Sequence, residues 1–334
     1  MIARVSIVGT TTWGTTLGIL RARKGIPVAI LSRTQEEAND LTARREHPRF
    51  LPGIPFPEIL TVSSDFDTLF DYSDLIILAV PSDRFRQNAR SIKEHLPSGC
   101  IVLSVTKGLE LPDGKRMSQV LEEELPDEFH SRICSLSGPN LAQEIVQGKP
   151  ASTVVAGRDD ASTSCAQEIL MSPSFRVYTS RDIIGVELGG TLKNIIALGA
   201  GIADGLGLGD NGKSALITRG LAEITRLGVA AGADPLTFAG LAGLGDIVAT
   251  CASPLSRNRY VGEQLAQGRS WSEIQASMQN VAEGVNTTGA ALEMADKLGV
   301  DMPIAQVTYR VLFEDLPPRQ AIAELMGRPP RPEW

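Results

Sequence analysis

We predict one long, largely apolar helix for the stretch Ile184-Gly-Val-Glu-Leu-Gly-Gly-Thr-Leu-Lys-Asn-Ile-Ile-Ala-Leu-Gly-Ala-Gly-Ile-Ala203, which divides the chain into two different halves. The residues before it alternate between strand and helix patterns, whereas no convincing strand pattern follows it. Its glycines at positions 189, 190, 199 and 201 each weaken a helix by roughly 1 kcal/mol relative to alanine. Their presence predicts that other segments approach this helix closely.

This helix carries one lysine, Lys193, which is followed by Asn194 and surrounded by leucine, isoleucine and alanine. A lysine that loses its solvation has a lowered pKa, which suits it to proton transfer near neutral pH. The alternative is a lysine whose ammonium group reaches the surface along its own apolar stem. The helix alone does not decide between the two, but the segments on either side favour the catalytic interpretation.

The composition is that of a soluble globular protein. The 334 residues are enough for two domains, and 43% hydrophobic with 21% charged residues are ordinary values. The net charge of -7 gives no support to a nucleic-acid or anionic-membrane partner. The four cysteines lie far apart, so we expect neither a metal site nor a disulfide framework. Without a leader-like segment or an uninterrupted apolar run, we expect a cytoplasmic protein with no membrane insertion.

The first half begins with a strand–turn–helix–strand unit that is typical of dinucleotide binding. Val5–Val8 is a short apolar strand, Gly9-Thr-Thr-Thr-Trp-Gly14 is the turn, a helix runs to Lys24, and Val28–Leu31 is the next strand. In such a unit the main-chain N–H groups at the helix N-terminus face a pyrophosphate. Thr11 replaces the middle glycine of the G-x-G-x-x-G pattern, so we expect its side chain to push the cofactor outward or to require a different loop path.

Arg33 bears on the choice of dinucleotide. An Asp or Glu at the end of the second strand holds the adenosine ribose in NAD-binding proteins. This chain has Ser32-Arg33-Thr34 there, and an arginine suits the 2′-phosphate of NADP. We therefore expect NADP(H) to be accepted or preferred, with an ordinary surface arginine as the alternative.

Strand and helix patterns alternate through the rest of this half, in which only residues 47–57, with four prolines, are expected to be irregular. Ligands of open α/β sheets bind outside the carboxyl ends of the strands. Lys107 and the helix opening Gly138-Pro-Asn140 occupy such positions, although a solvated loop lysine is the alternative for Lys107. We predict a Rossmann-like, α/β dinucleotide-binding domain of residues 1–183.

The second half, residues 184–334, is predicted to be an all-α domain. We expect Asn211 to cap a long helix, and we expect a helix after the glycine-rich segment 239–245 for which Asp246 would be the cap. In Ser256-Arg257-Asn258 a hydroxyl, a guanidinium and an amide follow one another at an expected helix start, which matches the needs of a phosphate. A helix cap with exposed arginines is the alternative.

Seven short stretches occur in an order and spacing that are highly specific when taken together. They are Trp13-Gly-Thr15, Ser104-Val-Thr-Lys-Gly-Leu109, Ser137-Gly-Pro-Asn-Leu-Ala142, Leu192-Lys-Asn-Ile195, Leu241-Ala-Gly-Leu-Gly-Asp246, Ser253-Pro-Leu-Ser-Arg-Asn-Arg259 and Val281-Ala-Glu-Gly284. In these stretches the chain resembles the bacterial NAD(P)-dependent glycerol-3-phosphate dehydrogenases, and the likeness extends along essentially the whole chain. The resemblance implies a Rossmann-like domain followed by a helical domain like that of 6-phosphogluconate dehydrogenase.

The resemblance also implies a reaction and a set of site residues. The family interconverts dihydroxyacetone phosphate and sn-glycerol 3-phosphate with NAD(H) or NADP(H), which feeds glycerophospholipid synthesis. Lys193 would be the catalytic residue, giving and taking the proton at the C2 oxygen of the substrate. The substrate would be bound by Lys107, Gly138, Asn140, Lys193, Asp246, Ser256, Arg257 and Asn258. The cofactor would be bound by Thr12, Trp13, Arg33, Lys107, Ala142, Arg257, Val281 and Glu283.

Three positions depart from the family pattern. Many members have glycine in place of Thr11, serine or alanine in place of Thr12, and serine in place of Asn140. The first two bear on how the pyrophosphate is held more than on which cofactor is bound. Asn140 retains a hydrogen-bonding group at the site.

We expect direct hydride transfer to C2 in a cleft between the two domains, with Asp246 and Asn194 orienting Lys193. One alternative is another NADP-dependent hydroxyacid or ketoacid reductase of the same plan, such as a ketopantoate-type enzyme. The cluster of residues 256–258 argues instead for a phosphorylated substrate. A second alternative is a dinucleotide sensor that has lost its chemistry. The sequence leaves the oligomeric state open, with a homodimer as one form.

Overall fold

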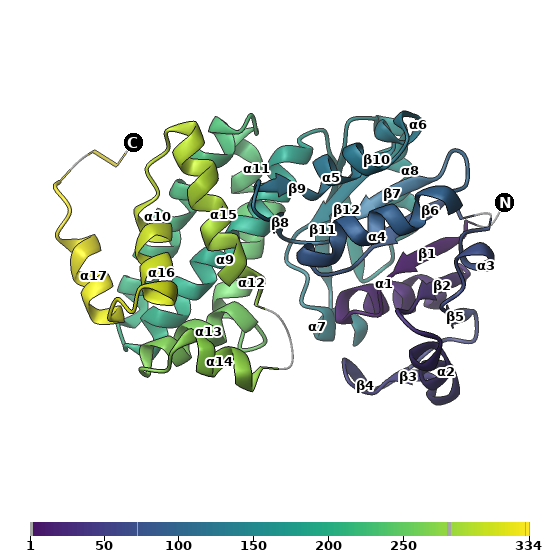
Figure 1. Cartoon of the computed structure of the whole chain (residues 1–334), viewed down its shortest axis with the longest axis horizontal. Helices are drawn as coiled ribbons and strands as arrows, with labels where there is room; N and C mark the ends of the chain where they lie inside the picture. The colour runs from purple at the N-terminus through teal and green to yellow at the C-terminus, as the bar shows by residue number, and fades with distance from the viewer. Residues whose placement is uncertain (1–2, 72, 279–281, 331, 334) are drawn as a thin grey trace. The chain divides into compact units, whose positions relative to one another are not determined.

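The computed structural model describes residues 3–71, 73–278, 282–330 and 332–333 (Figure 1). The chain forms two compact units. Unit 1 comprises Met1–Leu111 and Lys115–Glu187, and unit 2 comprises Pro112–Gly114 and Leu188–Trp334. Unit 1 is a Rossmann-like α/β unit and unit 2 is helical, which confirms the predicted fold class.

An eight-stranded sheet forms the centre of unit 1. Its strands are β1 (Val5–Val8), β2 (Val28–Leu31), β5 (Leu60–Ser63), β6 (Leu75–Leu78), β7 (Ile101–Ser104), β10 (Ile133–Ser137), β11 (Ala151–Gly157) and β12 (Phe175–Ser180). They lie in the order β12-β11-β10-β7-β6-β1-β2-β5, and neighbours are parallel except for the antiparallel pair β10 and β11. The carboxyl ends of six strands therefore share one edge of the sheet with the amino ends of β11 and β12.

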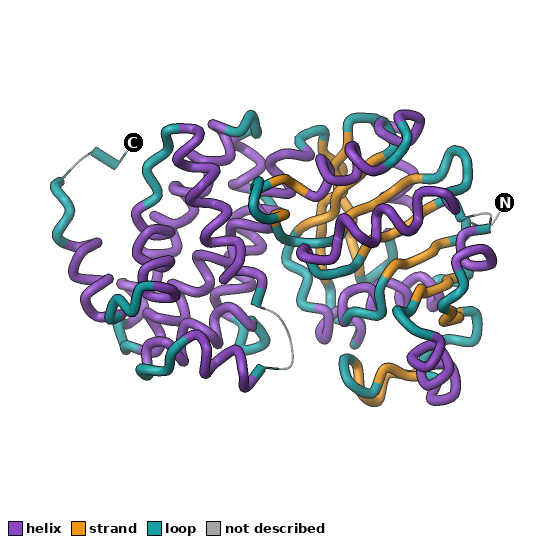
Figure 2. Tube along the Cα trace, viewed as in Figure 1, coloured by secondary structure: helices purple, strands orange, loops and turns teal. Residues whose placement is uncertain are grey.

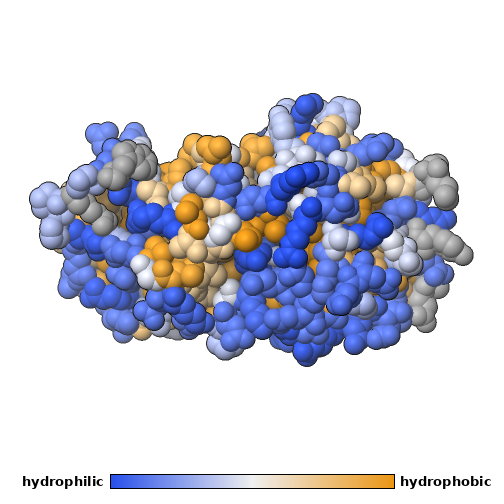
Figure 3. Space-filling model, turned by 90° about the horizontal axis from the view of Figure 1, so that it is seen from above, coloured by the Kyte–Doolittle hydropathy of each residue, from blue (hydrophilic) through white to orange (hydrophobic). Residues whose placement is uncertain are grey.

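Helices lie on both sides of this sheet (Figure 2). They are α1 (Thr12–Arg23), α2 (Gln35–Arg44), α3 (Phe66–Phe70), α4 (Phe85–Ile92), α5 (Met117–Glu124), α6 (Asp127–His130), α7 (Ala142–Val146) and α8 (Asp160–Leu170), with the 3-10 turns η1 (Ser82–Arg84) and η2 (Lys93–His95). Because both faces are covered, the central strands are continuous apolar runs, and every residue of β1, β6 and β7 is buried. Figure 3 shows that the outer surface, seen from above, is mostly hydrophilic with separate apolar patches.

The structure corrects the expectation for residues 47–57. The segment is not helical, as the prolines require, but it forms part of an antiparallel pair of strands, β3 (Glu46–His47) and β4 (Leu51–Pro55). A second antiparallel pair is β8 (Leu109–Glu110) and β9 (Lys115–Arg116). These ladders are too short to leave a clear alternating pattern in the sequence.

Helix α2 precedes the first of these pairs and was not predicted. Only Ala38 and Leu41 of this helix are buried, so its apolar periodicity is weak. Its ends are nevertheless well defined. The Thr34 hydroxyl accepts a hydrogen bond from the Glu37 N–H at 3.2 Å, and Arg45 ends the helix in the left-handed conformation, with φ of 55°.

The regular elements of unit 2, within its described residues, are helices. Its elements are α9 (Ile183–Gly205), which begins in unit 1, α10 (Gly209–Ala230), α11 (Pro235–Ala239), the π-helical turn η3 (Leu241–Gly245), α12 (Asp246–Ala252), α13 (Arg257–Ala266), α14 (Trp271–Ser277), α15 (Glu283–Leu298), α16 (Pro303–Phe313) and α17 (Pro318–Met326). Asp234 caps α11 ahead of Pro235 by accepting from the Leu236 N–H at 2.8 Å, as this cap-plus-proline pattern requires.

Helix α9 is the predicted long apolar helix and lies in the core. It is long and apolar enough to cross a membrane by composition, but 94% of its most apolar window is buried inside the protein. A Cβ atom added to Gly201 would lie 1.9 Å from the Arg259 carbonyl oxygen, and one added to Gly189 would lie 2.7 Å from the Ala242 carbonyl oxygen. The expectation that the glycines of this helix permit close approach is therefore confirmed.

Two helix starts in unit 2 lack a side-chain cap from the residue that precedes the helix. Helix α10 begins at Gly209, so Asn211 lies in its first turn and is not the expected cap. Helix α16 begins at Pro303, and its first N–H groups are satisfied from another helix: the buried carboxylate of Glu223, on α10, accepts from Ile304 at 3.0 Å and from Ala305 at 2.9 Å. This contact joins α10 to α16.

Candidate active site

Lys193 is buried in unit 2 with a carboxylate and a hydroxyl as partners. The residue is 7% exposed, and its ammonium group donates hydrogen bonds to Asp246 Oδ1 and, at 2.5 Å, to Thr250 Oγ1. The alternative of a lysine that reaches the surface along its stem is therefore wrong. Asp246 is 1% exposed, so the ion pair is almost completely withdrawn from water.

The packing of α9 against η3 explains how Lys193 meets Asp246. The main chains lie close together at Gly189 and Ala242, where a Cβ atom on the glycine would lie 2.7 Å from the Ala242 carbonyl oxygen. Lys193 follows Gly189 by four residues, and Asp246 follows Ala242 by four residues, so both side chains lie one turn beyond the contact.

Asp246 does not have the capping role that was expected of it. The π-helical turn η3 runs directly into α12, and Asp246 has helical dihedral angles with no side-chain hydrogen bond to the helix start. Its carboxylate turns instead to Lys193. Thr250 was missed by the sequence analysis, although its position one turn after Asp246 on the same helix face was a usable signal.

Asn258 and Asn194 form a second polar group within unit 2. The Asn258 amide donates to Asn194 Oδ1 at 2.9 Å and accepts from the Gly284 N–H at 3.0 Å, and both asparagines are buried. Asn194 was expected to orient Lys193, but its side-chain hydrogen bond within the described residues is to Asn258. The two asparagines thereby link α9, α13 and the first turn of α15.

Ser256 and Arg257 occupy the start of α13. The Ser256 hydroxyl accepts from the Arg259 N–H at 3.2 Å, so this serine is a helix cap, as one of the alternatives proposed. Arg257 retains exposed surface. Desolvation by the surrounding protein lowers the pKa of Arg257, whereas the negative charge of nearby Glu283 raises it. Val281, a predicted cofactor residue, lies outside the described residues.

The glycine-rich turn of unit 1 has the geometry of a pyrophosphate cradle. Gly9 has φ of 106°, and a Cβ atom there would lie 2.7 Å from the Ala79 carbonyl oxygen, so only glycine fits. At the start of α1, the main-chain N–H groups of Thr12 and Trp13 have no hydrogen-bond partner among the residues that the structure describes. Such groups at a helix N-terminus suit an anion.

Thr11 is accommodated by this turn. Its hydroxyl donates to the Ala79 carbonyl at 2.8 Å and accepts from the Gly14 N–H at 3.2 Å, which makes it the cap of α1. The hydroxyl is therefore turned into the protein, and both expectations for the cofactor at Thr11 stay predictions. A glycine could supply neither hydrogen bond.

The remaining predicted residues of unit 1 gather at the carboxyl edge of the sheet. Lys107, after β7, donates to the Gly138 carbonyl at 2.9 Å, and Asn140 donates to the Thr153 hydroxyl at 3.1 Å; Ala142 begins α7. Trp13 Nε1 and Asn140 Oδ1 are buried without a hydrogen-bond partner within the described part of the chain. Buried polar atoms of this kind are satisfied by water or by a bound ligand, and the donor and acceptor set fits a dinucleotide.

Arg33 lies at the end of β2 with its side chain exposed. Its guanidinium makes no hydrogen bond to the described residues, so it is available to an anion. The end of β2 has no Asp or Glu, but an acidic side chain from the following helix lies in this region. Glu37, in the first turn of α2, accepts from the Thr10 hydroxyl at 2.7 Å and from the Arg33 main-chain N–H at 3.1 Å.

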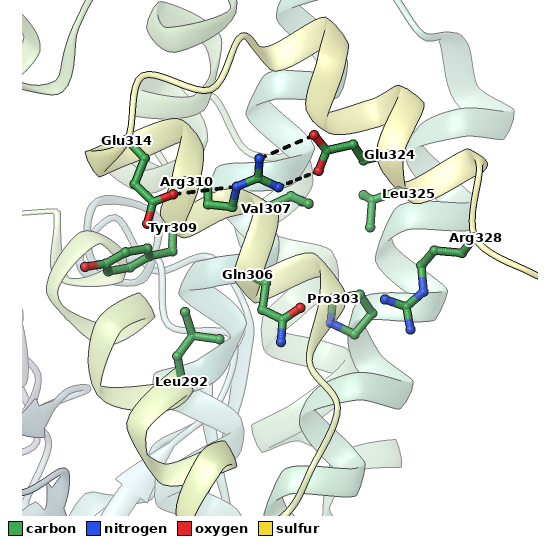
Figure 4. Close-up of a pocket in the computed structure, with 10 residues that line it drawn as sticks. All are labelled: Leu292, Pro303, Gln306, Val307, Tyr309, Arg310, Glu314, Glu324, Leu325 and Arg328. Atoms are coloured by element: carbon green, nitrogen blue, oxygen red, sulfur yellow. Dashed lines mark hydrogen bonds and ion pairs between the residues drawn. The ribbon is translucent and has the colours of Figure 1, made fainter.

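A pocket of about 380 Å³ lies elsewhere, on the last helices of unit 2 (Figure 4). Its residues are Leu292, Pro303, Gln306, Val307, Tyr309, Arg310, Glu314, Glu324, Leu325 and Arg328. None of them is a predicted site residue. Both arginines that line the pocket are ion-paired, Arg310 with Glu314 and Glu324 and Arg328 with Asp301, so neither offers an uncompensated charge to a phosphate.

Comparison with known proteins identifies the family of the chain. The model of the N-terminal domain of NAD-dependent glycerol-3-phosphate dehydrogenase matches residues 4–163, and the model of the C-terminal domain matches residues 182–323. The chain belongs to the NAD-dependent glycerol-3-phosphate dehydrogenase family. A glycerol-3-phosphate dehydrogenase [NAD(P)+] of Dehalococcoides mccartyi is 51% identical to it over 98% of this chain and 91% of the relative.

Solved structures agree with this membership of the glycerol-3-phosphate dehydrogenase family. The glycerol-3-phosphate dehydrogenase of Coxiella burnetii superposes with a TM-score of 0.92 at 36% identity, covering 98% of this chain and 99% of that one. A ketopantoate reductase of Ralstonia eutropha superposes with a TM-score of 0.59 at 16% identity, covering 97% of this chain and 99% of that one. The second likeness extends to the fold alone.

Proposed function

We propose that this chain catalyses the reversible reduction of dihydroxyacetone phosphate to sn-glycerol 3-phosphate with NAD(P)H, with Lys193 as the catalytic residue. The observation that carries the proposal is the buried Lys193 ammonium held by Asp246 and Thr250, in a chain whose two halves both match the dehydrogenase family. The product is a precursor of glycerophospholipids.

A bound nicotinamide supplies the hydride that is added to C2 of the ketone. Lys193, as an ammonium group, gives a proton to the oxygen that becomes negative in this step, and takes a proton from the alcohol in the reverse direction. Asp246 favours the charged form of the lysine and, with Thr250, directs its N–H groups. A group held in this way does not have to be reoriented during the reaction.

Arg257 and Asn258 recognise the phosphate of the substrate in this proposal. Arg257 contributes a guanidinium from the first turn of α13, where the helix dipole also favours an anion. Asn258 uses one amide N–H for Asn194 and its amide oxygen for Gly284, so in this proposal its second amide N–H serves the phosphate. Lys107, Gly138, Asn140 and Ser256 complete the proposed substrate set, together with Asp246 and Lys193 themselves.

The cofactor is held mainly by the turn after β1 in this proposal. The N–H groups of Thr12 and Trp13 would bind the pyrophosphate, and Arg33 would bind the 2′-phosphate of NADP(H). The remaining proposed cofactor residues are Lys107, Ala142, Arg257, Val281 and Glu283. Both NAD(H) and NADP(H) are cofactors in this proposal.

The decisive experiment mixes purified protein with NADPH and dihydroxyacetone phosphate and follows nicotinamide absorbance. We expect rapid loss of absorbance, and a fall of several orders of magnitude in kcat for Lys193→Ala with nucleotide affinity retained. Lys213→Ala is the matched control, because Lys213 is an ion-paired lysine of the same unit outside the proposed site. Turnover of ketopantoate but not of dihydroxyacetone phosphate would favour the reductase alternative, and nucleotide binding without any turnover would favour the sensor.

The proposal also includes the oligomeric state and the cellular location of the enzyme. We place the enzyme in the cytoplasm as a homodimer, with no nucleic-acid partner and no membrane insertion. The burial of α9 supports the last point. Light scattering on the purified protein at micromolar concentration tests the dimer, and a monomeric mass would refute it.

A further inference from the structure

Glu37 connects the two segments that border the adenosine ribose in a Rossmann unit. Its carboxylate accepts from Thr10, in the turn after β1, and from the main chain of Arg33, at the end of β2. The first turn of α2 thus brings an acidic group back to the place where NAD-binding proteins hold the 2′-hydroxyl of the ribose. In sequence this glutamate lies six residues beyond the end of β2, which is why the pattern of the strand end does not reveal it.

The Glu37 carboxylate has hydrogen-bond acceptor positions left for a ligand. An ionised carboxylate has about four acceptor positions on its two oxygens, whereas Glu37 has one hydrogen bond to each oxygen from the residues that the structure describes. One of the vacant positions could accept the 2′-hydroxyl of NAD(H). A 2′-phosphate in the same place would be repelled, because it carries the same sign of charge.

The charges around Glu37 are of both signs. Arg33 is exposed and adjacent, and it attracts a 2′-phosphate. Burial lowers the pKa of the nearby His47 ring, so at neutral pH this side chain adds no positive charge that would cancel the glutamate. Arg49 is a further cation near His47. Glu37 and Arg33 therefore place opposite charges in the same small part of the surface.

The geometry points to Glu37 as the residue that limits the preference for NADP(H) over NAD(H) set by Arg33. This inference rests on the proposed function and deepens it, since it concerns the same cofactor site. Arg33 binds the 2′-phosphate of NADP(H), and Glu37 binds the 2′-hydroxyl of NAD(H). A chain that carries both groups uses both cofactors.

Binding of two nucleotide fragments tests this without any turnover. Adenosine 2′,5′-bisphosphate and adenosine 5′-phosphate differ only at the 2′ position, and titration calorimetry gives the Kd of each. For Glu37→Gln we expect the bisphosphate to bind about tenfold more tightly and the monophosphate a few-fold more weakly. For Arg33→Gln we expect the bisphosphate alone to weaken, by at least about tenfold.

Glu36 provides a matched control. It lies beside Glu37 in the first turn of α2, carries the same charge and is exposed. Glu36→Gln should leave the ratio of the two Kd values within about twofold of the wild-type ratio, because more distant exposed charges are screened. If Glu36→Gln and Glu37→Gln shift the ratio equally, or if Glu37→Gln shifts neither Kd, the inference is wrong.

Further measurements distinguish a wrong role for Glu37 from a wrong proposed function and from a variant that does not fold. Glu37→Ser should shift the ratio in the same direction as Glu37→Gln, and circular dichroism shows whether each variant is folded. Failure of the wild type to reduce dihydroxyacetone phosphate would contradict the proposed function while leaving the ratio measurable. An unchanged ratio in an active enzyme would contradict the role of Glu37 alone.

Discussion

Lys193 and Asp246 form a buried ion pair between α9 and the first residue of α12. Two charges withdrawn from water are costly unless each is compensated, and removing one partner leaves the other uncompensated. Here the lysine also bonds to Thr250, so the ammonium has defined directions for its N–H groups. The arrangement combines burial with a fixed orientation, which is what a proton donor requires.

Asp246→Asn should lower kcat by at least about 100-fold, because the buried ammonium loses the charge that favours its protonated form. Thr250→Val should have a smaller effect, about tenfold, because one hydrogen bond is lost without a change of charge. Steady-state rates with NADPH and dihydroxyacetone phosphate measure both. Asp204→Asn is the control, since Asp204 is also an ion-paired aspartate of unit 2; a comparable loss of kcat there would show that any such change impairs the enzyme.

Gly201→Ala should destabilise the protein by about 3 kcal/mol or more, because the new methyl group would meet the Arg259 carbonyl at 1.9 Å and neither backbone can yield easily. Gly199→Ala, two residues earlier in the same helix, meets only the flexible Leu216 side chain at 3.2 Å. There the helix propensity of alanine should hold the change in stability within about 1 kcal/mol. Urea unfolding compares the two, and equal stabilities would contradict the helix contact described for α9.

Glu223 should make stability depend on pH. Burial raises the pKa of this carboxyl to about 7, with the hydrogen bonds from Ala305 and Ile304 acting in the opposite direction. Because the folded pKa lies above the unfolded value, its contribution to stability is fully present below the unfolded pKa and is lost as the pH rises through about 7. Wild type should therefore lose up to roughly 3 kcal/mol relative to Glu223→Gln between acidic and alkaline pH.

Chemical denaturation at about pH 5 and about pH 8 measures this difference. Glu223→Ala tests the contact itself, because it leaves the N–H groups of Ile304 and Ala305 unsatisfied and should cost about 2–4 kcal/mol. A pH profile of Glu223→Gln that matched the wild type would show that this carboxyl does not titrate between those pH values.

Thr11 should matter for stability more than for cofactor binding. Thr11→Val removes the cap of α1 and the hydrogen bond to Ala79, at a cost of about 1–2 kcal/mol. Thr11→Ser keeps the hydroxyl and should be close to wild type. Thermal unfolding measures the first effect, and the Kd of adenosine 5′-diphosphate measures the second. A large loss of nucleotide affinity in a well-folded Thr11→Val variant would contradict the inward orientation of the hydroxyl.

Local patterns predicted much of the architecture. The bounds of β1 and β2 agree with the sequence, since short apolar runs report burial directly. The cap at Asp234 is equally local, because its partner is the N–H two residues away. Helix α2 was not predicted because it buries too few apolar side chains to give a helical periodicity in the sequence.

The sequence by itself determined the change from an α/β half to a helical half, the apolar helix with its one lysine, and the family of the chain, since each depends on residues close together or on a pattern along the whole length. Only the tertiary structure decided what Asp246, Thr11 and Glu37 do. Asp246 and Thr11 are good helix-cap residues in isolation and Glu37 suits the first turn of a helix, but each has its decisive partner on a segment distant in the chain: Lys193, Ala79 and Thr10. A hydrogen bond depends on distance and direction in space, and neither is written in the spacing of residues along the chain.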